Sequence, residues 1–181
     1  MYPYNPEKAK ALIQEAGFSA ERPLQFTLQT HAADPVLPTI ATIIKTQLAS
    51  IGVEVNIEVL DRPLYLKNLR TYDYEQSLTI SSHFVDPYAR AYVLESHAGA
   101  LNTANHSDTH VDLLIDKLRR APGSDEFLKI SHELQTYIAE RMIYPTIAPS
   151  PFVQASRDHV KGYIFMRGLK VSFETTWLEK P

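Results

Sequence analysis

The chain has 181 residues, of which 44% are hydrophobic and 22% are charged, and its formal net charge is −3. A chain of this length fits one domain with a sizeable buried core. Its slightly acidic balance, without clustered lysine and arginine, argues against nucleic acid and anionic membrane surfaces as partners. The absence of cysteine excludes thiol nucleophiles and disulfides, and no apolar run approaches the roughly 20 residues of a membrane span.

The amino-terminal part alternates helical and strand patterns. Asn5 before Pro6 predicts a helix start, and period-two alternation predicts strands at residues 24–30 and 53–59. The first helix should bury Ala9, Leu12, Ile13 and Ala16, and a second helix between the two strands should bury Leu37, Ile40, Ile44, Leu48 and Ile51. A strand, helix and strand in this order imply a parallel pair with a right-handed crossover.

A second crossover follows. Asp61 begins a short predicted helix, after which residues 74–80 are typical of a third strand. Residues 81–107 have the pattern of a loop with a short helix, too long for a mere connection. The helix that begins at Asp61 should bury Tyr65, Leu66 and Leu69.

The carboxyl-terminal part begins with two predicted helices, from Asp108 to Arg120 and over residues 124–142. The first should bury Val111, Leu114, Ile115 and Leu118, and the second Phe127, Leu128, Leu134, Tyr137 and Ile138. Four further strands are predicted at 144–148, 152–155, 163–166 and 169–173. Prolines confine the first two of these to edge or irregular positions.

These patterns together predict an α/β fold class: a three-layer lobe with a largely parallel sheet built from βαβ units, flanked by helices, with additional strands near the carboxyl terminus. Because no repeat or linker divides the chain, we expect a single α/β domain over residues 1–181. Six scattered glycines form neither a phosphate-binding loop nor a G-x-S-x-G nucleophile elbow. Nucleotide enzymes and serine hydrolases are therefore disfavoured.

The best metal candidate is HSDTH at residues 106–110. His106 and His110 are four apart, which on a helix allows them to share a metal, and Asp108 could add an oxygen ligand. However, the pair spans a predicted helix start, where Asp108 is better explained as the N-cap, and no third ligand is indicated. A polar helix start is favoured over a metal site, and no metal or other cofactor is predicted.

Residues 81–86 begin where the third predicted strand ends. In open α/β sheets, ligands bind outside the carboxyl ends of the strands. Ser81, Ser82, His83 and Asp86 offer two hydroxyls, an imidazole and a carboxylate there for a solute. Asp86 equally fits the cap of a short helix. Catalysis by His83 and Asp86 is disfavoured because no nucleophile or oxyanion site is visible beside them.

No basic and apolar leader follows Met1. The sequence therefore predicts either a cytosolic protein or a part of a longer chain whose signal peptide lies elsewhere. Composition does not choose between the two.

The run YNPEKAKALIQEAGF at residues 4–18 closely resembles the segment that opens the second lobe of extracellular solute-binding proteins of family 5. These are the oligopeptide-, dipeptide- and nickel-binding proteins of ABC importers. Further segments agree with that family in the same order: QLASIGVEV at 47–55, the Asp86–Pro87 pair, Asn102 followed by VDLLI at 111–115, and VKGY at 160–163. The resemblance spans essentially the whole chain.

The resemblance implies a periplasmic-binding-protein-like fold and a carboxyl-terminal lobe, because family members carry a further, N-terminal lobe before this point. Such receptors are not enzymes; they capture a small solute between two lobes outside the cytoplasmic membrane and deliver it to ABC permease subunits. We therefore expect a periplasmic or extracellular location and a monomer without a cofactor. Residues 174–181 are expected to form a tail that packs on the other lobe.

One departure from the family bears on the solute. Peptide binders of the family often carry a tryptophan and then an aspartate before the Asp–Pro pair, and that aspartate pairs with the peptide's amino group. The corresponding positions here are Ile80 and His83. A free amine would lose its carboxylate partner, which favours a neutral or anionic solute over a peptide. Arg90 could pair with an anion, although an exposed helix arginine is the commoner case, and Asn102 is a further candidate contact.

Two alternatives stay open. A small enzyme would rest on His83 and Asp86, or on a metal held by His106 and His110, and would show turnover or stoichiometric metal. A cytosolic interaction module would require a native gene that starts at Met1 without an upstream lobe.

Overall fold

The computed structural model describes residues 2–80, 86–94, 96, 98–148, 155–165 and 171–179; for Val93, Phe165 and Val171 it describes the backbone alone. The chain packs as two compact units. Unit 1 comprises Met1–Ile80 and Thr103–His106, and unit 2 comprises Ser81–Asn102 and Ser107–Pro181. A single domain over residues 1–181 with a tail at 174–181 stays a prediction.

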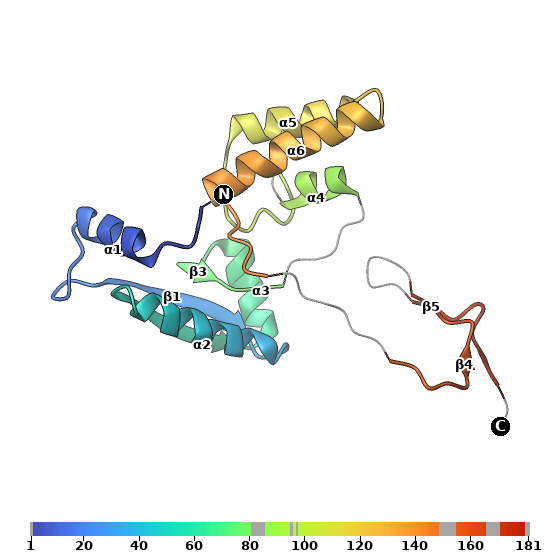
Figure 1. Ribbon diagram of the computed structural model, residues 1–181, viewed down its shortest axis with the longest axis horizontal. Helices are drawn as coiled ribbons and strands as arrows, with labels where there is room; N and C mark the ends of the chain where they lie inside the picture. Colours follow the sequence, from blue (N-terminus) through green and yellow to red (C-terminus); the bar gives the residue numbers. More distant parts are fainter. Residues whose placement is uncertain are drawn as a thin grey trace. The chain divides into compact units, whose positions relative to one another are not determined.

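Unit 1 is built on a parallel sheet of three strands, β1 (Leu24–His31), β2 (Val53–Leu60) and β3 (Gln76–Ser77), in the order β2-β1-β3. β1 and β2 pair along their full length, from Leu24 opposite Val53 to His31 opposite Leu60. Helix α2 (Val36–Ala49) connects β1 to β2, and helix α3 (Arg62–Thr71) connects β2 to β3 (Figure 1). The predicted βαβ arrangement is confirmed.

Helix α2 covers one face of the sheet with apolar side chains. Leu37 and Ala41 are fully buried in a cluster with Leu28, Val53 and Val55 of the strands. The other apolar residues predicted to be buried here pack around the same cluster: Ile40, Ile44 and Leu48 of α2, and Ile51, which follows the helix. A fourteen-residue helix with this stripe can bury it only against the sheet, which fixes α2 on that face.

Helix α3 contributes mostly polar contacts to the opposite face. Its N-cap is Asp61, whose carboxylate accepts a hydrogen bond from the Leu64 amide at 2.8 Å. Tyr65 is 1% exposed, and Asn68 and Leu69 are also buried, so two of the three buried side chains of this helix carry polar groups. Those groups must find hydrogen-bond partners within the unit.

The third strand is shorter than the predicted 74–80. The ladder between β1 and β3 contains only two pairs, Leu28 with Gln76 and Gln29 with Ser77. Before it, the Thr27 amide of β1 donates to the Glu75 side chain at 2.6 Å instead of to a strand carbonyl. After it, the Leu78 carbonyl accepts side-chain hydroxyls. At both ends of β3, hydrogen bonds to side chains replace the backbone hydrogen bonds between β1 and β3. The alternation of apolar and polar residues does not predict such side-chain contacts.

Helix α1 (Pro6–Glu15) begins as predicted, with the Asn5 side chain accepting from the Lys8 amide at 2.9 Å. The predicted apolar face is wrong, because α1 contains no buried residue and Leu12 is 53% exposed. Only Ile13 packs against the unit 1 core. One contact of this kind contributes little burial energy, so α1 relies mainly on its own cap and hydrogen bonds.

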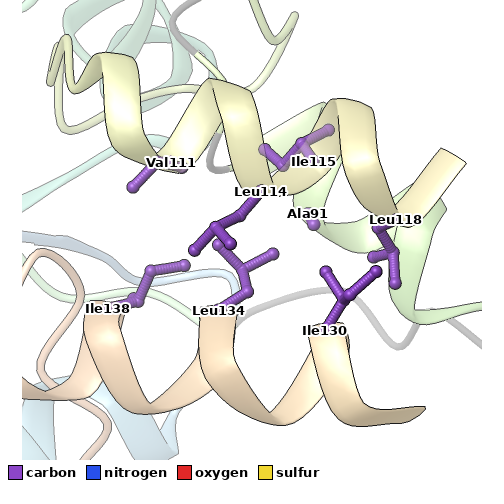
Figure 2. Close-up of a cluster of buried hydrophobic side chains, with 8 residues drawn as sticks. All are labelled: Ala91, Val111, Leu114, Ile115, Leu118, Ile130, Leu134 and Ile138. Atoms are coloured by element: carbon purple, nitrogen blue, oxygen red, sulfur yellow. The ribbon is translucent and has the colours of Figure 1, made fainter. Parts of the chain in front are cut away.

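The core of unit 2 lies between helices α5 (Thr109–Arg120) and α6 (Ser124–Arg141), with Ala91 of α4 (Pro87–Leu94) at its side. Figure 2 shows the side chains of α5 and α6 directed toward one another. All four predicted α5 residues are buried, which confirms that stripe. The buried cluster comprises Ala91, Val111, Leu114, Ile115, Leu118, Ile130, Leu134 and Ile138.

The predicted stripe of α6 needs one correction. Leu128 was expected to be buried, but it is 54% exposed, and Ile130 is buried instead. Ile130, Leu134 and Ile138 are spaced four residues apart and therefore lie on one helix face, whereas Leu128 falls on the opposite side. Phe127 and Tyr137 flank the cluster partly buried.

Two short antiparallel pairs form the carboxyl-terminal part: β4 (Val160–Lys161) with β7 (Trp177–Leu178), and β5 (Ile164–Phe165) with β6 (Val171–Ser172). Within the described residues, the predicted strands at 163–166 and 169–173 contain β5 and β6; residues 166 and 169–170 of these predictions lie outside the described residues. β4 and β7 were not predicted. Gly162 between β4 and β5 has φ +67, and a Cβ there would meet the Thr175 carbonyl, so this turn needs glycine.

The strand predicted at residues 144–148 is wrong, because these residues carry no strand. Pro145 lacks an amide donor, and the Tyr144 hydroxyl donates to the Leu94 carbonyl at 2.8 Å, which ties the segment to α4 instead of to a sheet. In the strand predicted at 152–155, residues 152–154 lie outside the described residues, and Ala155 is not in a strand.

Candidate functional site

The carboxyl ends of β1 and β2 meet at one edge of the unit 1 sheet, the edge at which open α/β sheets bind ligands. His31 is the last residue of β1, and the Ala32 amide continues the pairing to the Leu60 carbonyl at 3.2 Å. The His31 ring lies edge-on to Tyr65, with 4.9 Å between ring centroids. Its Nδ1 atom is buried and has no hydrogen-bond partner among the described residues.

Three hydroxyls gather beside this edge, where β3 ends. The Tyr65 hydroxyl lies 2.7 Å from Ser77 Oγ and 3.1 Å from the Leu78 carbonyl oxygen. Thr30 Oγ1 donates to the same carbonyl at 3.1 Å. Thr30 is 0% exposed and Tyr65 is 1% exposed, so water does not compete for these hydrogen bonds.

A second polar group lies on the α3 face of the sheet. Gln29 Nε2 donates to the Glu58 carboxylate at 2.8 Å, and Asn68 Nδ2 donates to Gln29 Oε1 at 3.2 Å. β1, β2 and α3 are thus joined through one buried amide. The arrangement stabilises the sheet from the side that α2 does not cover.

Of the predicted site residues, Ser81, Ser82 and His83 lie outside the described residues. Asp86 is described and exposed: its Oδ1 accepts from the Tyr88 amide at 3.0 Å, and its carbonyl accepts from the Arg90 amide at 3.1 Å. These bonds confirm Asp86 as the cap of α4. Contact of Asp86 with a solute stays a prediction.

The other two predicted contacts belong to unit 2. Arg90 is partly buried on α4. Asn102 is 6% exposed, and its Oδ1 lies 3.4 Å from the Tyr144 hydroxyl. The same hydroxyl reaches the Leu94 carbonyl, so Asn102 takes part in a buried junction between the end of α4 and the segment after α6. Solute contact by Arg90 and Asn102 also stays a prediction.

The histidine pair does not have the helical spacing that metal sharing would need. Helix α5 begins at Thr109, so His106 precedes the helix, and Asp108 is its N-cap with bonds to the His110 and Val111 amides at 2.9 and 3.4 Å. The favoured prediction, a polar helix start, is confirmed. Within the described ranges, no group of three or more His, Asp or Glu side chains could hold a metal ion.

Asp108 also joins α5 to α6, because the Tyr137 hydroxyl donates to its Oδ2 at 2.9 Å. Desolvation raises the pKa of Asp108, but the Tyr137 and backbone hydrogen bonds and the Arg141 charge outweigh it and leave that pKa below its ordinary value. The same hydrogen bond raises the pKa of Tyr137. Arg141 lies over the Tyr137 ring at 5.0 Å, and His110 packs against that ring at 4.6 Å between centroids.

The described surface includes the following depressions. One of about 570 Å³ lies at the amino ends of β1 and β2, and is lined by residues that include Gln25, Thr27, Glu54 and Glu75. Another of about 380 Å³ lies on α5 and α6, and includes His110 and His132. Neither lining includes a predicted solute contact. The first lies at the opposite end of β1 and β2 from the carboxyl edge.

Sequence reasoning missed the residues that organise the carboxyl edge, which are Thr30, His31, Tyr65 and Ser77. A signal was present: β1 ends in Gln29, Thr30 and His31, three polar residues on a strand whose burial begins with Leu28. Polar residues at the buried end of a parallel strand need partners, and that need could have indicated a network there.

Comparison with known proteins gives the family. Residues 1–102 match the family described as bacterial extracellular solute-binding proteins, family 5 Middle. This match covers more than half of the chain, and the chain belongs to that family of binding proteins. The resemblance inferred from the sequence is confirmed.

The curated relatives are named for different ligands. The chain is 29% identical over 169 residues to di/tripeptide-binding protein 2 of Pseudomonas aeruginosa, covering 90% of this chain and 31% of that protein. It is 26% identical over 167 residues to nickel-binding protein NikA of Staphylococcus aureus, covering 88% and 33%. The chain therefore spans about a third of the length of these relatives.

Solved structures show the fold. NikA from Staphylococcus aureus in complex with Ni(L-His)2 superposes with a TM-score of 0.72 at 20% identity, over 99% of this chain and 40% of that one. A nickel ABC transporter structure from Bacillus halodurans gives 0.66 at 24% identity, over 79% and 32%. The predicted fold class, periplasmic-binding-protein-like α/β, is confirmed. None of the described helices combines the length and apolar character of a membrane span.

Proposed function

We propose that this chain is the carboxyl-terminal lobe of the extracytoplasmic solute receptor of an ABC importer. In this proposal, the receptor binds a small solute in the cleft between two lobes and delivers it to permease subunits. The observation that carries it is the family match over residues 1–102, which includes the whole parallel sheet. The length of the relatives, about three times that of the matched part, supports a further lobe in the parent protein.

The proposed activity is binding without turnover, because the matched family and its named relatives are binding proteins. The parent is proposed to be a monomer, located in the periplasm or outside the cell. Its partners would be the N-terminal lobe of the same chain and the permease. Closure of the two lobes on the solute would be the mechanical step.

The proposed solute contacts are Ser81, Ser82, His83, Asp86, Arg90 and Asn102. Support comes from the position of residues 81–86 directly after the third strand, because ligands bind at the carboxyl ends of parallel strands. Asp86 caps α4 and so fixes the point from which Arg90 is presented. In this proposal Asn102 acts from within unit 2, as part of its junction with Tyr144.

The proposed solute is a small neutral or anionic polar molecule. A neutral imidazole at His83 offers one donor and one acceptor, whereas peptide binders of the family often place a carboxylate at that position. The names of the relatives span peptides, nickel and heme, so the family scaffold accommodates more than one class of solute.

The tail is proposed to pack on the other lobe. Phe173, Trp177 and Leu178 are 66%, 54% and 66% exposed on β7 and in the segment before it. Large apolar side chains that stay exposed together mark surfaces that associate with another protein segment. The parent's N-terminal lobe is the proposed occupant.

Calorimetric titration tests this function. The full-length parent and the 181-residue chain are each titrated with triglycine, with the Ni(II)–histidine complex and with hemin. We expect the parent to bind one of them, and the chain alone to bind it at least about tenfold more weakly because half of the contacts are missing. Binding by the chain at the parent's affinity would contradict the two-lobe proposal. Triglycine recovered as glycine would contradict binding without turnover.

A further inference from the structure

Hydrogen bonds from side chains hold the chain at the end of β3. Ordinary parallel strands are held by backbone ladders, but the ladder here ends at the Gln29–Ser77 pair. Leu78 still belongs to the unit 1 core: its side chain is 7% exposed, and its amide donates to the Gln29 carbonyl at 2.9 Å. Thr79 and Ile80, which follow, are exposed. Leu78 is therefore the last anchored residue before the chain leaves the sheet.

The Leu78 carbonyl accepts two hydrogen bonds from side chains of different elements. Thr30 Oγ1 of β1 and the Tyr65 hydroxyl of α3 each lie 3.1 Å from it. If Tyr65 donates its one proton to that carbonyl, then Ser77 Oγ, 2.7 Å away, donates to Tyr65. Each hydroxyl then donates once, and Leu78 is fixed from the sheet and from the helix together.

We propose that Thr30 and Tyr65 are positioning residues, whose hydroxyls set the direction in which the chain leaves the sheet toward the proposed solute contacts. The consequence for the solute rests on the proposed function; the positioning of Leu78 does not. Both donors are almost fully buried, so their geometry is preorganised and does not depend on surface water. At the start of β3, the Glu75 side chain fixes the strand in a similar way, because it accepts a hydrogen bond from the Thr27 amide of β1.

Amide hydrogen exchange on the 181-residue chain, read by NMR, tests the positioning. Tyr65→Phe and Thr30→Val remove one hydroxyl each while keeping the buried volume nearly constant. We expect exchange of the Leu78 amide to rise about three- to tenfold in each variant, the usual effect of one lost hydrogen bond. Amides in the β1–β2 ladder should keep their exchange rates. Thr30→Ser keeps the hydroxyl and should restore the wild-type rate at Leu78.

Tyr144→Phe is the matched control, because it removes another tyrosine hydroxyl that donates to a backbone carbonyl, in unit 2. It should leave the Leu78 amide unchanged. An equal rise of exchange across the β1–β2 ladder would show that the hydroxyls only stabilise the unit, and would overturn the proposal. Unchanged exchange at Leu78 in both test variants would overturn it as well.

The solute arm uses the full-length parent with whichever of triglycine, Ni(II)–histidine and hemin the wild type binds. The double variant Thr30→Val/Tyr65→Phe should weaken binding of that probe about three- to tenfold. Tyr137→Phe, which removes the hydroxyl that donates to Asp108, should not. Unchanged binding of that probe by the double variant would overturn the link between Leu78 and the solute. A wild-type parent that binds none of triglycine, Ni(II)–histidine and hemin would count against the proposed function, while the exchange results would still decide the positioning.

Discussion

A tyrosine hydroxyl joins two elements in each unit, but with different partners. In unit 1, Tyr65 is 1% exposed and contacts neutral groups, the Ser77 hydroxyl and the Leu78 carbonyl. In unit 2, Tyr137 is partly buried and donates to the charged carboxylate of Asp108, with Arg141 over its ring. Neutral partners keep their hydrogen bonds over a wide pH range, whereas a carboxylate partner changes with its protonation.

Unlike these tyrosine contacts, the apolar cores of the two units resemble each other. Unit 1 packs α2 on one face of the sheet, and unit 2 packs α5 on α6, each with a contiguous buried cluster. Because each unit buries a contiguous apolar cluster, burial of apolar residues supplies most of the stability in both units. The polar groups decide where particular atoms lie, and how that placement responds to conditions.

The largest expected effects come from the two cores. Leu37→Ala in unit 1 and Leu114→Ala in unit 2 remove side chains that are 1% and 0% exposed. Each should lower the free energy of unfolding by about 2–5 kcal/mol, because the transfer energy is lost and a cavity remains. Urea unfolding measures this. The control Leu128→Ala, at a 54% exposed position, should change it by less than about 0.5 kcal/mol.

Loss of the Gln29–Asn68 hydrogen bond on the α3 face of the sheet should lower the free energy of unfolding by a smaller amount. Asn68→Ala leaves the buried Gln29 Oε1 without its donor, and should lower the free energy of unfolding by about 1–3 kcal/mol. Replacing both partners, Gln29→Leu with Asn68→Leu, should recover part of that loss, because no buried amide is then left without its partner, and the Glu58 carboxylate, which loses the Gln29 donor, is exposed to water. A double variant less stable than the sum of the single variants would contradict this account of the face.

The contrast between the two tyrosines predicts an acid-dependent contribution from the Asp108–Tyr137 contact of unit 2. The folded pKa of Asp108 lies below its unfolded value, so its contribution is fully present above an unfolded pKa of about 3.9 and is lost as pH falls through the folded pKa. Asp108→Asn should therefore flatten the loss of stability below about pH 4, read from urea midpoints. Tyr65→Phe should leave the steepness of that acid limb unchanged. An acid limb of wild-type steepness in Asp108→Asn would refute the assignment.

The smallest effect is expected on α1. Leu12→Ser alters a side chain that is 53% exposed and lies outside the buried cluster. The midpoint of thermal unfolding should shift only slightly, corresponding to less than about 0.5 kcal/mol. A large destabilisation would mean that α1 packs in solution as the helical periodicity first predicted.

Much of the fold could be predicted because its elements carry local signals. Asn5, Asp61 and Asp108 cap the helices they were predicted to cap, and the alternation in β1 and β2 places Leu28, Val53 and Val55 in the core. Periodicity failed where no partner covers the expected face, as at Leu12, or where two helix faces compete, as at Leu128.

The candidate site was predictable only in its location. The rule that ligands meet the carboxyl ends of parallel strands indicates the edge, but the contacts of Thr30 and Tyr65 with Leu78 join residues 48 and 13 positions apart. Sequence periodicity carries no information on such long-range hydrogen bonds. The short β3 was missed for the same reason, because Glu75 and two hydroxyls replace its ladder.

Residues 81–86, which follow β3, are proposed to contact the solute, and substitution of His83 tests that contact. The dissociation constant of the full-length parent for its solute is measured by calorimetry with His83 and with His83→Ala. We expect His83→Ala to weaken binding by about 1–3 kcal/mol, the usual effect of stranding a buried hydrogen-bond partner, with little change in melting temperature. His83→Asp should shift preference toward ligands with a free amine. Unchanged binding together with a clear loss of melting temperature in His83→Ala would contradict the claim.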